Sequence, residues 1–439
     1  MPLQSYEMKD SGVEWIGEIP KDWDKRCLKT LLTVLRGGSP RPIEEYLTDS
    51  PDGINWIKIG DTTKGTKVIF STKQKIKPSG VAKSRMVHKG DLLLTNSMSF
   101  GEPYFLEVDG CIHDGWVCLT NLIGIDKLFL YYFLCSDFCT KQFQLQVDGG
   151  VVQNLNIEKI GKTIIFLPSM HEQQSIAAYL DEKCVAIDEI IAEAKATIDE
   201  YKSWKASVIF EAVTKGLNPN AEMKDSGVEW IGRIPKDWKV ISLRYLGKCQ
   251  NGISKDGEAF GSGFPFVSYT DVYKNIVLPG EASRLVESTE DERERYSVKY
   301  GDIFFTRTSE TIEEIGFSSV CLKTIDNATF AGFLIRFRPT NNKLYPEYSK
   351  YYFRSELQRR YFVKEMTLVT RASLGQELLK SMPVILPPFE TQQKIAAYLD
   401  EKCAAIDGVI AEKEALIGEL ESYKKSLIFE TVTGKRRVC

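Results

Sequence analysis

Three short motifs could carry enzymatic chemistry, but the sequence around each argues against it. Residues 260–263 (FGSG) resemble a glycine turn for S-adenosylmethionine, which joins a strand to a helix, whereas the flanking residues here favour a flexible loop. Residues 386–389 (LPPF) resemble the Asn/Asp-Pro-Pro-aromatic loop of adenine methyltransferases, but leucine cannot hydrogen-bond an amino group, so we interpret them as a helix start. Residues 60–67 hold Thr and Lys in the wrong order for a phosphate loop. We therefore expect no catalysis from this chain.

A second group of residues has the chemistry to bind DNA phosphates. Nine Lys or Arg residues and one acid, Asp61, lie in residues 58–89, and nine basic residues face three acids in residues 336–371. A charge run is more often only a solvated face, but each diverged part of this chain has its own run. Phosphate contacts position a protein on DNA without specifying sequence. Our candidates are Lys58, Lys73, Lys75 and Lys77.

Polar side chains after two similar apolar segments could read base edges. Asn and Arg make bidentate contacts to adenine and guanine, and Ser and Thr can bind either. The first choices follow GDLLL and GDIFF, at Thr95, Asn96 and Ser97 and at Arg307, Thr308 and Ser309. The second choices are Ser39, Arg41, Asn251, Ser254 and Arg371. The alternative for each of these residues is a turn cap or an ordinary surface position.

These candidates lie in a chain that contains two internal repeats. Residues 7–23 (EMKDSGVEWIGEIPKDW) recur at 222–238 with one change, Glu18 to Arg233. About 30 of the 49 residues from 167 to 215 match the residues 219 positions later, whereas residues 27–166 and 242–385 share almost no identity. A repeated frame that carries two diverged inserts suggests one task performed on two different targets.

The second repeat predicts two long helices. Between residues 173 and 213, apolar side chains recur every three or four positions without Pro or Gly, as in a coiled coil, and the later copy repeats the pattern. About 40 residues form a rod of roughly 60 Å. We expect the two copies to pack antiparallel with one insert at each end; the alternative is two separate coiled-coil segments that bind outside partners.

The inserts read as mixed α/β units, so the predicted fold is α+β with a pseudo-two-fold internal duplication. Strands are expected at 54–59, 91–95, 117–121, 264–269, 302–306 and 333–338, and aromatic helices at 128–133 and 348–353. The predicted segments are a first domain at 1–166, a first long helix at 167–220, a second domain at 221–385 and a second long helix at 386–439.

Composition limits the class of protein. The net charge is −3, and the acid excess lies on the two predicted long helices rather than on the inserts. No apolar run is long enough to span a bilayer, and the N-terminus does not resemble a signal peptide. Ten cysteines without a CxxC pair are typical of reduced thiols, and three histidines make a zinc site improbable. We expect a cytoplasmic protein with no metal site.

The order of these elements resembles the specificity subunit of type I restriction–modification systems. The resemblance rests on Trp-Ile-Gly-x-Ile-Pro-x-x-Trp at 15–23 and 230–238, on Gln-Gln before IAAYLDEK in both helices, and on the Gly-Asp-apolar-Thr segments. It spans essentially the whole chain. One departure is Thr391, which stands where the first copy has Glu172.

The resemblance implies a non-catalytic subunit that recognises double-stranded DNA. Each insert would be a target-recognition domain that reads one half of a split sequence, and the paired helices would act as a spacer and dock two methyltransferase subunits. Two motor–nuclease subunits are further expected partners. No cofactor is expected on this chain, because S-adenosylmethionine, ATP and Mg belong to the partner subunits. Two alternatives remain open: a stand-alone DNA-binding regulator with two reading heads, and a coiled-coil protein adaptor.

Overall fold

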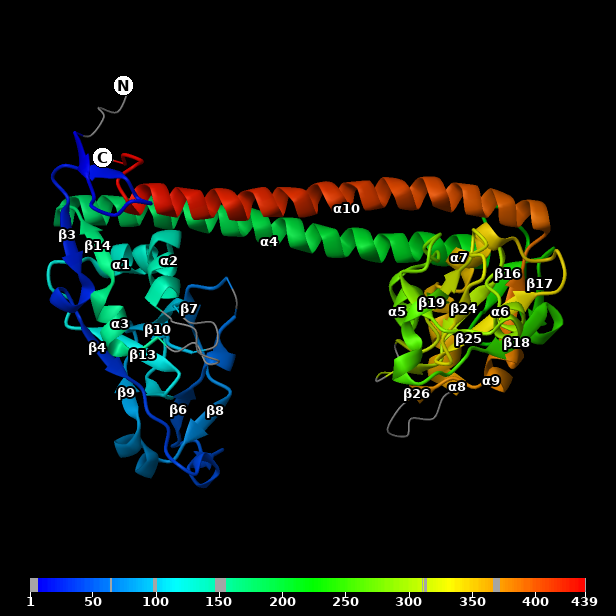
Figure 1. The fold of residues 1–439 in the computed structure, drawn as a ribbon, viewed down its shortest axis with the longest axis horizontal. Coiled ribbons are helices and arrows are strands. Elements are labelled where there is room, and N and C mark those ends of the chain that lie inside the picture. Colours follow the sequence, from blue (N-terminus) through cyan, green and yellow to red (C-terminus); the bar gives the residue numbers. More distant parts are fainter. Residues whose placement is uncertain are drawn as a thin grey trace. The chain divides into compact units, whose positions relative to one another are not determined.

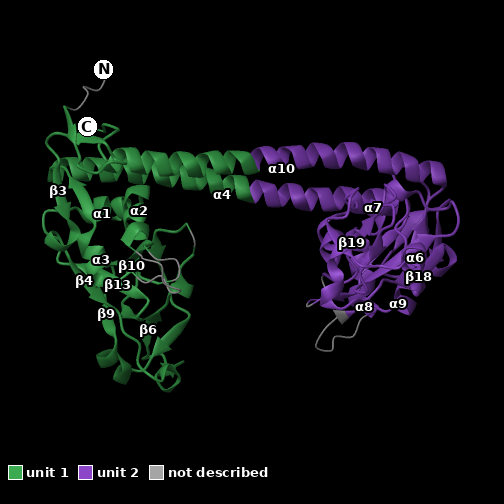
Figure 2. Ribbon diagram, in the orientation of Figure 1, with its two compact units in different colours: residues 1–195, 414–439 green, residues 196–413 purple. Residues whose placement is uncertain are grey.

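The computed structural model describes residues 7–63, 65–97, 101–146, 155–309, 311, 314–365 and 372–438. The chain forms two compact units, one of residues 1–195 and 414–439 and the other of residues 196–413 (Figure 2). We call them unit 1 and unit 2. Each unit contains one diverged insert and about half of each long helix. This division follows packing, and the four segments defined by the repeats stay a prediction.

The two predicted long helices are confirmed. They are α4 (Met170–Lys215) with 46 residues and α10 (Phe389–Val432) with 44 residues. Within each unit their segments lie side by side and run in opposite directions (Figure 1). The predicted apolar seam is buried, for example at Leu180 and Ile187 in unit 1 and at Leu399 and Ile406 in unit 2. Each helix therefore buries its apolar stripe against the other copy. No described helix is long and apolar enough to cross a membrane.

Unit 1 is built on two five-stranded sheets. Strand β10 (Leu92–Thr95) is buried on both faces, with Leu92 and Leu94 in the core beneath the helices and Leu93 in the core that lies between the sheets. Because β10 is buried on both faces, its sequence is a continuous apolar run rather than an alternation of apolar and polar residues. The first sheet has the order β4 (Thr33–Arg36), β13 (Trp116–Thr120), β10, β11 (Pro103–Leu106), β7 (Val68–Ile69). The second has the order β5 (Leu47–Thr48), β8 (Gln74–Ile76), β6 (Ile54–Ile57), β12 (Gly110–Ile112), β9 (Arg85–Val87).

The remaining elements of unit 1 connect the sheets to the repeated frame. The duplicated N-terminal segment forms an antiparallel strand pair, and a second pair joins the two ends of the insert. These strands are β1 (Met8–Asp10) with β2 (Glu18–Pro20), and β3 (Asp24–Cys27) with β14 (Ile164–Leu167). The helices are α1 (Lys127–Cys135), α2 (Asp137–Gln146) and α3 (Ile157–Lys162).

Unit 2 repeats this plan with smaller sheets. Its four-stranded sheet has the order β18 (Gly247–Asn251), β25 (Leu334–Pro339), β21 (Ile303–Thr306), β23 (Ser318–Val320). Its three-stranded sheet has the order β20 (Arg284–Val286), β19 (Phe260–Val267), β24 (Thr329–Phe330). Separate strand pairs are β15 (Met223–Asp225) with β16 (Arg233–Pro235), β17 (Lys239–Ser242) with β27 (Pro383–Leu386), and β22 (Thr308–Ser309) with β26 (Ala372–Ser373). The helices are α5 (Tyr269–Lys274), α6 (Glu290–Arg295), α7 (Pro346–Tyr352), α8 (Glu356–Glu365) and α9 (Gln376–Ser381).

One secondary-structure prediction is wrong. The glycine-rich residues 260–263 lie in strand β19 rather than in a flexible loop. The strand pairing shifts between Phe260 and Phe264, and Gly261 and Gly263 have φ angles of 105° and 94°. Glycine adopts such angles readily, so the motif forms a bulge instead of interrupting the strand. The LPPF segment is a helix start, as predicted, because β27 ends at Leu386 and α10 begins at Phe389.

The repeated Gln and Asp side chains of the two long helices make equivalent contacts in the two units. Gln173 accepts a hydrogen bond from the Asp126 backbone at 2.8 Å, and Gln392 accepts one from the Tyr345 backbone at 2.9 Å. Asp181 accepts a hydrogen bond from the Tyr132 hydroxyl at 2.7 Å, and its counterpart Asp400 accepts one from Tyr351 at 2.6 Å. Helix α4 therefore holds α1, and helix α10 holds α7, through the same two contacts.

The departure at Thr391 changes a contact with the other repeated motif. In unit 1 the buried Trp23 ring nitrogen donates to Glu172 at 3.2 Å. Thr391 and Trp238 occupy the corresponding positions in unit 2, and threonine cannot supply a carboxylate there.

Candidate nucleic-acid interface

Three chain segments that lie far apart in the sequence meet at the strand ends of unit 1. We call this place the first corner; it comprises residues 37–41, 95–97 and 113–115. Gly37 donates its backbone N–H to Trp116 at 2.9 Å, and Asn96 donates its backbone N–H to Gly115 at 3.0 Å. A Cβ atom on Gly37 would lie 2.1 Å from the carbonyl oxygen of His113. Only glycine therefore permits the two segments to approach so closely.

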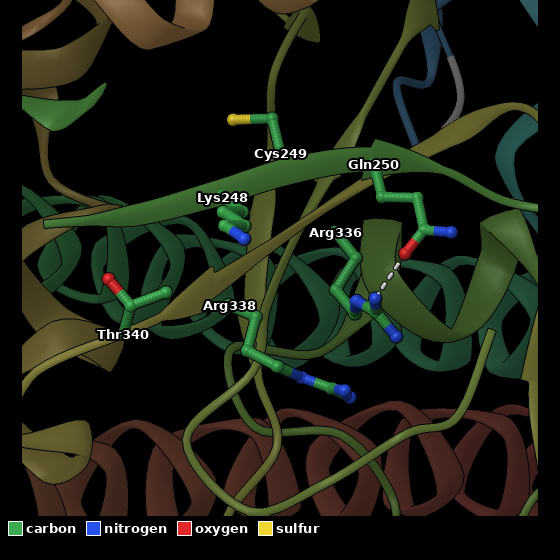
Figure 3. A pocket seen from close by; sticks show the side chains of 6 residues that line it. All are labelled: Lys248, Cys249, Gln250, Arg336, Arg338 and Thr340. Atoms are coloured by element: carbon green, nitrogen blue, oxygen red, sulfur yellow. Dashed lines mark hydrogen bonds between the residues drawn. The ribbon is translucent and has the colours of Figure 1, made fainter. Parts of the chain in front are cut away.

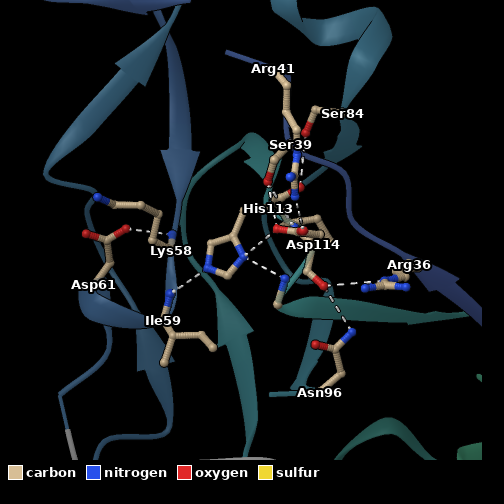
Figure 4. A network of polar contacts seen from close by, with 12 residues as sticks. Arg36, Ser39, Arg41, Lys58, Ile59, Asp61, Ser84, Asn96, His113 and Asp114 are labelled. Atoms are coloured by element: carbon tan, nitrogen blue, oxygen red, sulfur yellow. Dashed lines mark hydrogen bonds and ion pairs between the residues drawn. The ribbon is translucent and has the colours of Figure 1, made fainter. Parts of the chain in front are cut away.

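Asp114 is the polar centre of the first corner (Figure 4). Its carboxylate accepts hydrogen bonds from Ser39 at 2.8 Å and from Arg41 at 3.3 Å. Its backbone oxygen accepts bonds from the Asn96 amide at 3.1 Å and from Arg36 at 3.4 Å. The Ser39 hydrogen bond lowers the pKa of Asp114 below its ordinary value, so the side chain is an anion at neutral pH.

His113, beside Asp114, is held as a neutral ring. Its two ring nitrogens face the backbone N–H groups of Ile59 at 3.2 Å and Gly115 at 2.6 Å. A neutral imidazole can accept only one of these bonds, and a protonated ring can accept neither. Burial also lowers the pKa of His113. His113 and Asp114 were not among the predicted site residues, although the dipeptide lies in a turn between two apolar segments.

An open pocket extends from the first corner across the second sheet. Arg41 and Lys58 lie at this pocket, and the Lys58 ammonium donates to the Gln74 side chain at 2.8 Å. The other lining residues are Ser39, Pro40, Pro42, Ile43, Leu47, Trp56 and His113. The pocket thus combines apolar and aromatic walls with groups that can bind base edges. Gln74 also lines the pocket but was not among the predicted site residues. Its position between Lys73 and Lys75, inside the first basic run, is the sequence signal that could have identified it.

The remaining phosphate candidates lie on and beside strand β8. The ammonium groups of Lys73, Lys75 and Lys77 donate to the backbone oxygens of Gly60, Pro51 and Glu45, at 2.9, 3.2 and 2.7 Å. Since an ammonium has three N–H groups, each lysine retains donors for a phosphate. Their contact with DNA stays a prediction.

The first-choice residues of unit 1 are more buried than the lysines. Thr95 is fully buried and accepts a hydrogen bond from the backbone of Glu102 at 3.0 Å, and Asn96 is 5% exposed. Ser97 is half-buried. In this conformation Thr95 and Asn96 support the corner from within, and their contact with bases stays a prediction.

The same corner recurs in unit 2. We call residues 251–254, 306–309 and 331–333 the second corner. A Cβ atom on Gly252 would lie 2.1 Å from the Phe330 carbonyl oxygen, as on Gly37 in unit 1. Gly332 donates its backbone N–H to Ile253 at 2.7 Å, and Arg307 donates its own to Phe333 at 2.9 Å. The structure therefore brings the predicted residues Asn251, Ser254 and Arg307 into one corner, formed by β18, β21 and the turn before β25.

Side chains of the second corner differ from those of the first. Ser254 is exposed beside Gly332, and a Cβ atom at position 332 would lie 2.4 Å from its hydroxyl oxygen. Asn251 accepts a hydrogen bond from Gln376 at 3.0 Å. Phe333 is 64% exposed on the turn, and it was missed although it is an aromatic residue directly after a glycine.

The other two predicted residues that the structure describes in unit 2 also lie in the second corner, on β22. The Thr308 carbonyl accepts a hydrogen bond from Tyr269 at 2.9 Å, and the Ser309 hydroxyl contacts Glu314 at 3.5 Å. Arg371 lies outside the described residues.

The start of the second basic run has a structural role (Figure 3). Arg336 is 5% exposed and donates to the Ser297 carbonyl at 2.5 Å and to the Gln250 side chain. Burial lowers the pKa of Arg336 to about 10. Arg338 binds both carboxylate oxygens of Asp302 at 2.6 Å. These two cations line a small pocket with Lys248, Cys249, Gln250 and Thr340. Because Arg336 is buried and Arg338 is held by Asp302, they are poor candidates for phosphate binding.

Both corners combine hydrogen-bonding groups with an arginine, Arg41 in the first and Arg307 in the second. Among the described residues, no group of three or more His, Cys, Asp or Glu side chains could hold a metal ion. The described cysteines are free thiols.

Comparisons with known proteins agree on one family. The model of the type I restriction modification DNA specificity domain matches residues 20–200 and 235–416. The chain is 26% identical over 468 residues to a putative type I restriction enzyme MjaX specificity subunit of Methanocaldococcus jannaschii, covering 99% of both chains. It is 22% identical to the type I restriction enzyme EcoKI specificity subunit of Escherichia coli K12, covering 95% of this chain and 90% of that protein. A solved chain, described in connection with complex assembly and conformational transition of the type I R-M system, has the same fold, with a TM-score of 0.72, 16% identity and coverage of 95% and 99%.

Proposed function

Because the chain belongs to the type I restriction modification DNA specificity family, whose model matches both of its halves, we propose that it is the DNA specificity subunit of a type I restriction–modification complex. In this role it reads a bipartite DNA target, with one half-site at the corner of each unit. The observation that carries the proposal is the divergence of these two corners within a repeated frame.

The comparison of the corners supports two different half-sites. Gly37 and Gly252 make the same close backbone approach, and Ser39 and Ser254 follow each glycine by two residues. The adjoining turn, however, reads His-Asp-Gly at residues 113–115 and Ala-Gly-Phe at 331–333. Two different base sequences need different donors, acceptors and apolar contacts. Two domains that read different base sequences need different side chains at the corner, and the corner can keep the same backbone in both.

The long helices supply a surface for partner subunits. Trp204 and Tyr423 occupy equivalent positions in the second repeat, and both side chains are about half exposed. Large exposed aromatic residues are frequent at protein interfaces. We propose that two methyltransferase subunits dock on these helices, and that two motor–nuclease subunits join the complex. The partners would supply S-adenosylmethionine, ATP and Mg, and this chain would supply sequence specificity without catalysing methyl transfer.

Methylation assays with and without a methyltransferase partner test this proposal. The purified chain should bind DNA in a salt-dependent manner but transfer no methyl group, and the reconstituted complex should methylate one bipartite motif. Methylation by the chain alone would overturn the proposal. Tight binding to a specific site with no effect on any methyltransferase would favour a stand-alone regulator, and absence of DNA binding by the complex would favour a protein adaptor.

A further inference from the structure

We propose that Arg41 reads a guanine in the half-site bound by unit 1 and that Asp114 positions it for this contact. The inference rests on the proposed function and assigns a specific base to a specific side chain. It predicts that the half-site of unit 1 contains a guanine whose recognition depends on Arg41.

The Asp114 residue is held in place by contacts that do not involve Arg41. One of its oxygens accepts the Ser39 hydroxyl at 2.8 Å, and the other contacts the Arg41 guanidinium at 3.3 Å. The Asp114 backbone is held by the amide of Asn96, itself buried at the end of β10. Asp114 is therefore anchored from both neighbouring segments, and its charge has one preferred position at the corner.

Arg41 needs such an anchor because its side chain is 80% exposed. An exposed arginine samples many rotamers, and ordering it on DNA costs conformational entropy. An ion pair this exposed contributes little to stability. Its main effect is to restrict the guanidinium to one side of the corner before DNA arrives, which lowers the entropic cost of binding.

The geometry of a guanidinium selects guanine among the bases. It has five N–H donors in a planar fork, and the contact with Asp114 uses one. The remaining donors can bind the O6 and N7 acceptors of guanine together, which is the commonest specific contact in the major groove. The lysines of unit 1 lack this fork. Lys58 in addition binds Gln74, which leaves Arg41 as the guanine-reading side chain of the pocket.

The second corner provides an internal comparison. Ser254 occupies the place of Ser39, but Gly332 occupies the place of Asp114. Arg41 lies four residues after Gly37, and the residue four positions after Gly252 is Asp256. Both members of the pair are absent from these positions of the second corner, so the contact that depends on the Arg41–Asp114 pair is assigned to the first half-site only.

Sequencing of methylated DNA tests the inference in the reconstituted complex. The variants are Arg41→Ala, Arg41→Lys, Asp114→Asn and the double variant Arg41→Ala/Asp114→Asn. The matched control is Arg26→Ala, which removes another exposed arginine of unit 1 that pairs with an aspartate, Asp24, at 3.2 Å. Unfolding curves of each variant verify that unit 1 remains folded.

The expected result is a change at one base pair. Arg41→Ala should reduce discrimination for guanine at a single position of the first half-site by about 10- to 100-fold, with the second half-site unchanged. The Arg41→Lys variant should not restore the discrimination for guanine, because lysine lacks the planar fork of donors. Asp114→Asn should relax the same position about 3- to 10-fold, and it should add nothing in the Arg41→Ala background, because Asp114 acts through Arg41. Arg26→Ala should leave the motif unchanged.

Three outcomes would overturn the inference without overturning the proposed function. They are a first half-site that contains no guanine, an Arg41→Ala variant with an unaltered motif, and an Arg41→Ala variant that weakens all sequences equally, which marks a phosphate contact. A wild-type complex that methylates no specific motif would instead contradict the proposed function itself.

Discussion

Lys205 of α4 and Asp407 of α10 form a two-pronged ion pair in unit 2, with the ammonium nitrogen 2.7 and 2.6 Å from the two carboxylate oxygens. Lys424 and Asp188 form the same ion pair in unit 1, at 2.7 and 2.6 Å. Each residue lies 219 positions from its counterpart, which is the spacing of the repeat. The duplicated frame is therefore preserved down to single ion pairs between the helices.

Equivalent substitutions in these two pairs should have equivalent effects. The carboxylates are 55% and 44% exposed, so Lys205→Ala or Lys424→Ala should each lower the free energy of unfolding by at most about 1 kcal/mol. Exchange of both charges, as in Lys205→Asp/Asp407→Lys, should recover part of the loss. Urea unfolding curves measure these values. A difference of more than about 2 kcal/mol between the two alanine variants would contradict the equivalence of the repeats.

Glycine at the two corners should be essential for the local packing of each domain. Gly37→Ala and Gly252→Ala would each place a Cβ atom 2.1 Å from a carbonyl oxygen. We expect each to lower the free energy of unfolding by about 1–3 kcal/mol and to impair recognition of one half-site only. Thermal unfolding and methylation of the two half-sites provide the measurements.

Two other glycines serve as controls for these variants. A Cβ atom at Gly60 or at Gly257 would meet nothing within 4 Å. Alanine at either position should therefore be tolerated. If the Gly37→Ala variant were as stable as the Gly60→Ala variant, the result would contradict the close approach of the two corner segments at Gly37.

The stability of unit 1 should fall below pH 6.5 because of His113. Burial lowers the pKa of His113 from its ordinary value of 6.5, so the folded ring resists protonation. Above pH 6.5 the ring is neutral in both states. As the pH falls below 6.5, the unfolded chain gains a proton that the folded chain does not, and the free energy of unfolding decreases by at most about 1.4 kcal/mol per pH unit. Carboxylates titrate mainly below this range.

Urea unfolding between pH 5 and pH 8 measures this effect in wild type and in His113→Gln. The variant should lose the part of the pH slope that comes from position 113, and the exposed His88→Gln variant is the matched control. An unchanged slope in His113→Gln would show that another group is responsible.

The long helices should determine the non-specific spacer between the half-sites. Insertion of one heptad after Ala194 and another after Lys413 lengthens each helix by about 10 Å at 1.5 Å per residue. This equals roughly three base pairs at 3.4 Å, with about 100° of additional DNA twist. We expect a longer spacer or lost activity, with each half-site unchanged. Full activity on the original spacer would show that the helices do not set the distance.

Much of the fold could be predicted because it depends on local periodicity and on the repeat. The apolar runs that contain Leu93 and Phe304 became strands β10 and β21, since residues buried on both faces leave a continuous apolar signal. The helix seam followed from its heptad spacing. The bulge at Gly261 was not predictable, because a glycine in a bulged strand and one in a loop look alike in sequence.

The candidate site was predicted only in part because its residues converge through tertiary structure. Polar residues after each Gly-Asp strand were selectable, but Thr95 is bonded to the segment at Glu102 and Asn96 to the turn at Gly115, and neither contact is visible in the local sequence. Asp114 and Phe333 lie on that turn in units 1 and 2, and no local pattern distinguishes them from ordinary turn residues. Their importance follows from what lies beside them in space.

The most direct test of the account exchanges one insert and reads the methylated motif. The ends of the first insert adjoin, because Arg26 pairs with Ile165 in the β3–β14 ladder, so residues 27–166 can be replaced as a block by the insert of another family member. Sequencing of methylated DNA from the reconstituted complex should show a new first half-site, with the second half-site unchanged. A simultaneous change of both half-sites would contradict the claim that the two domains are independent readers on a common frame.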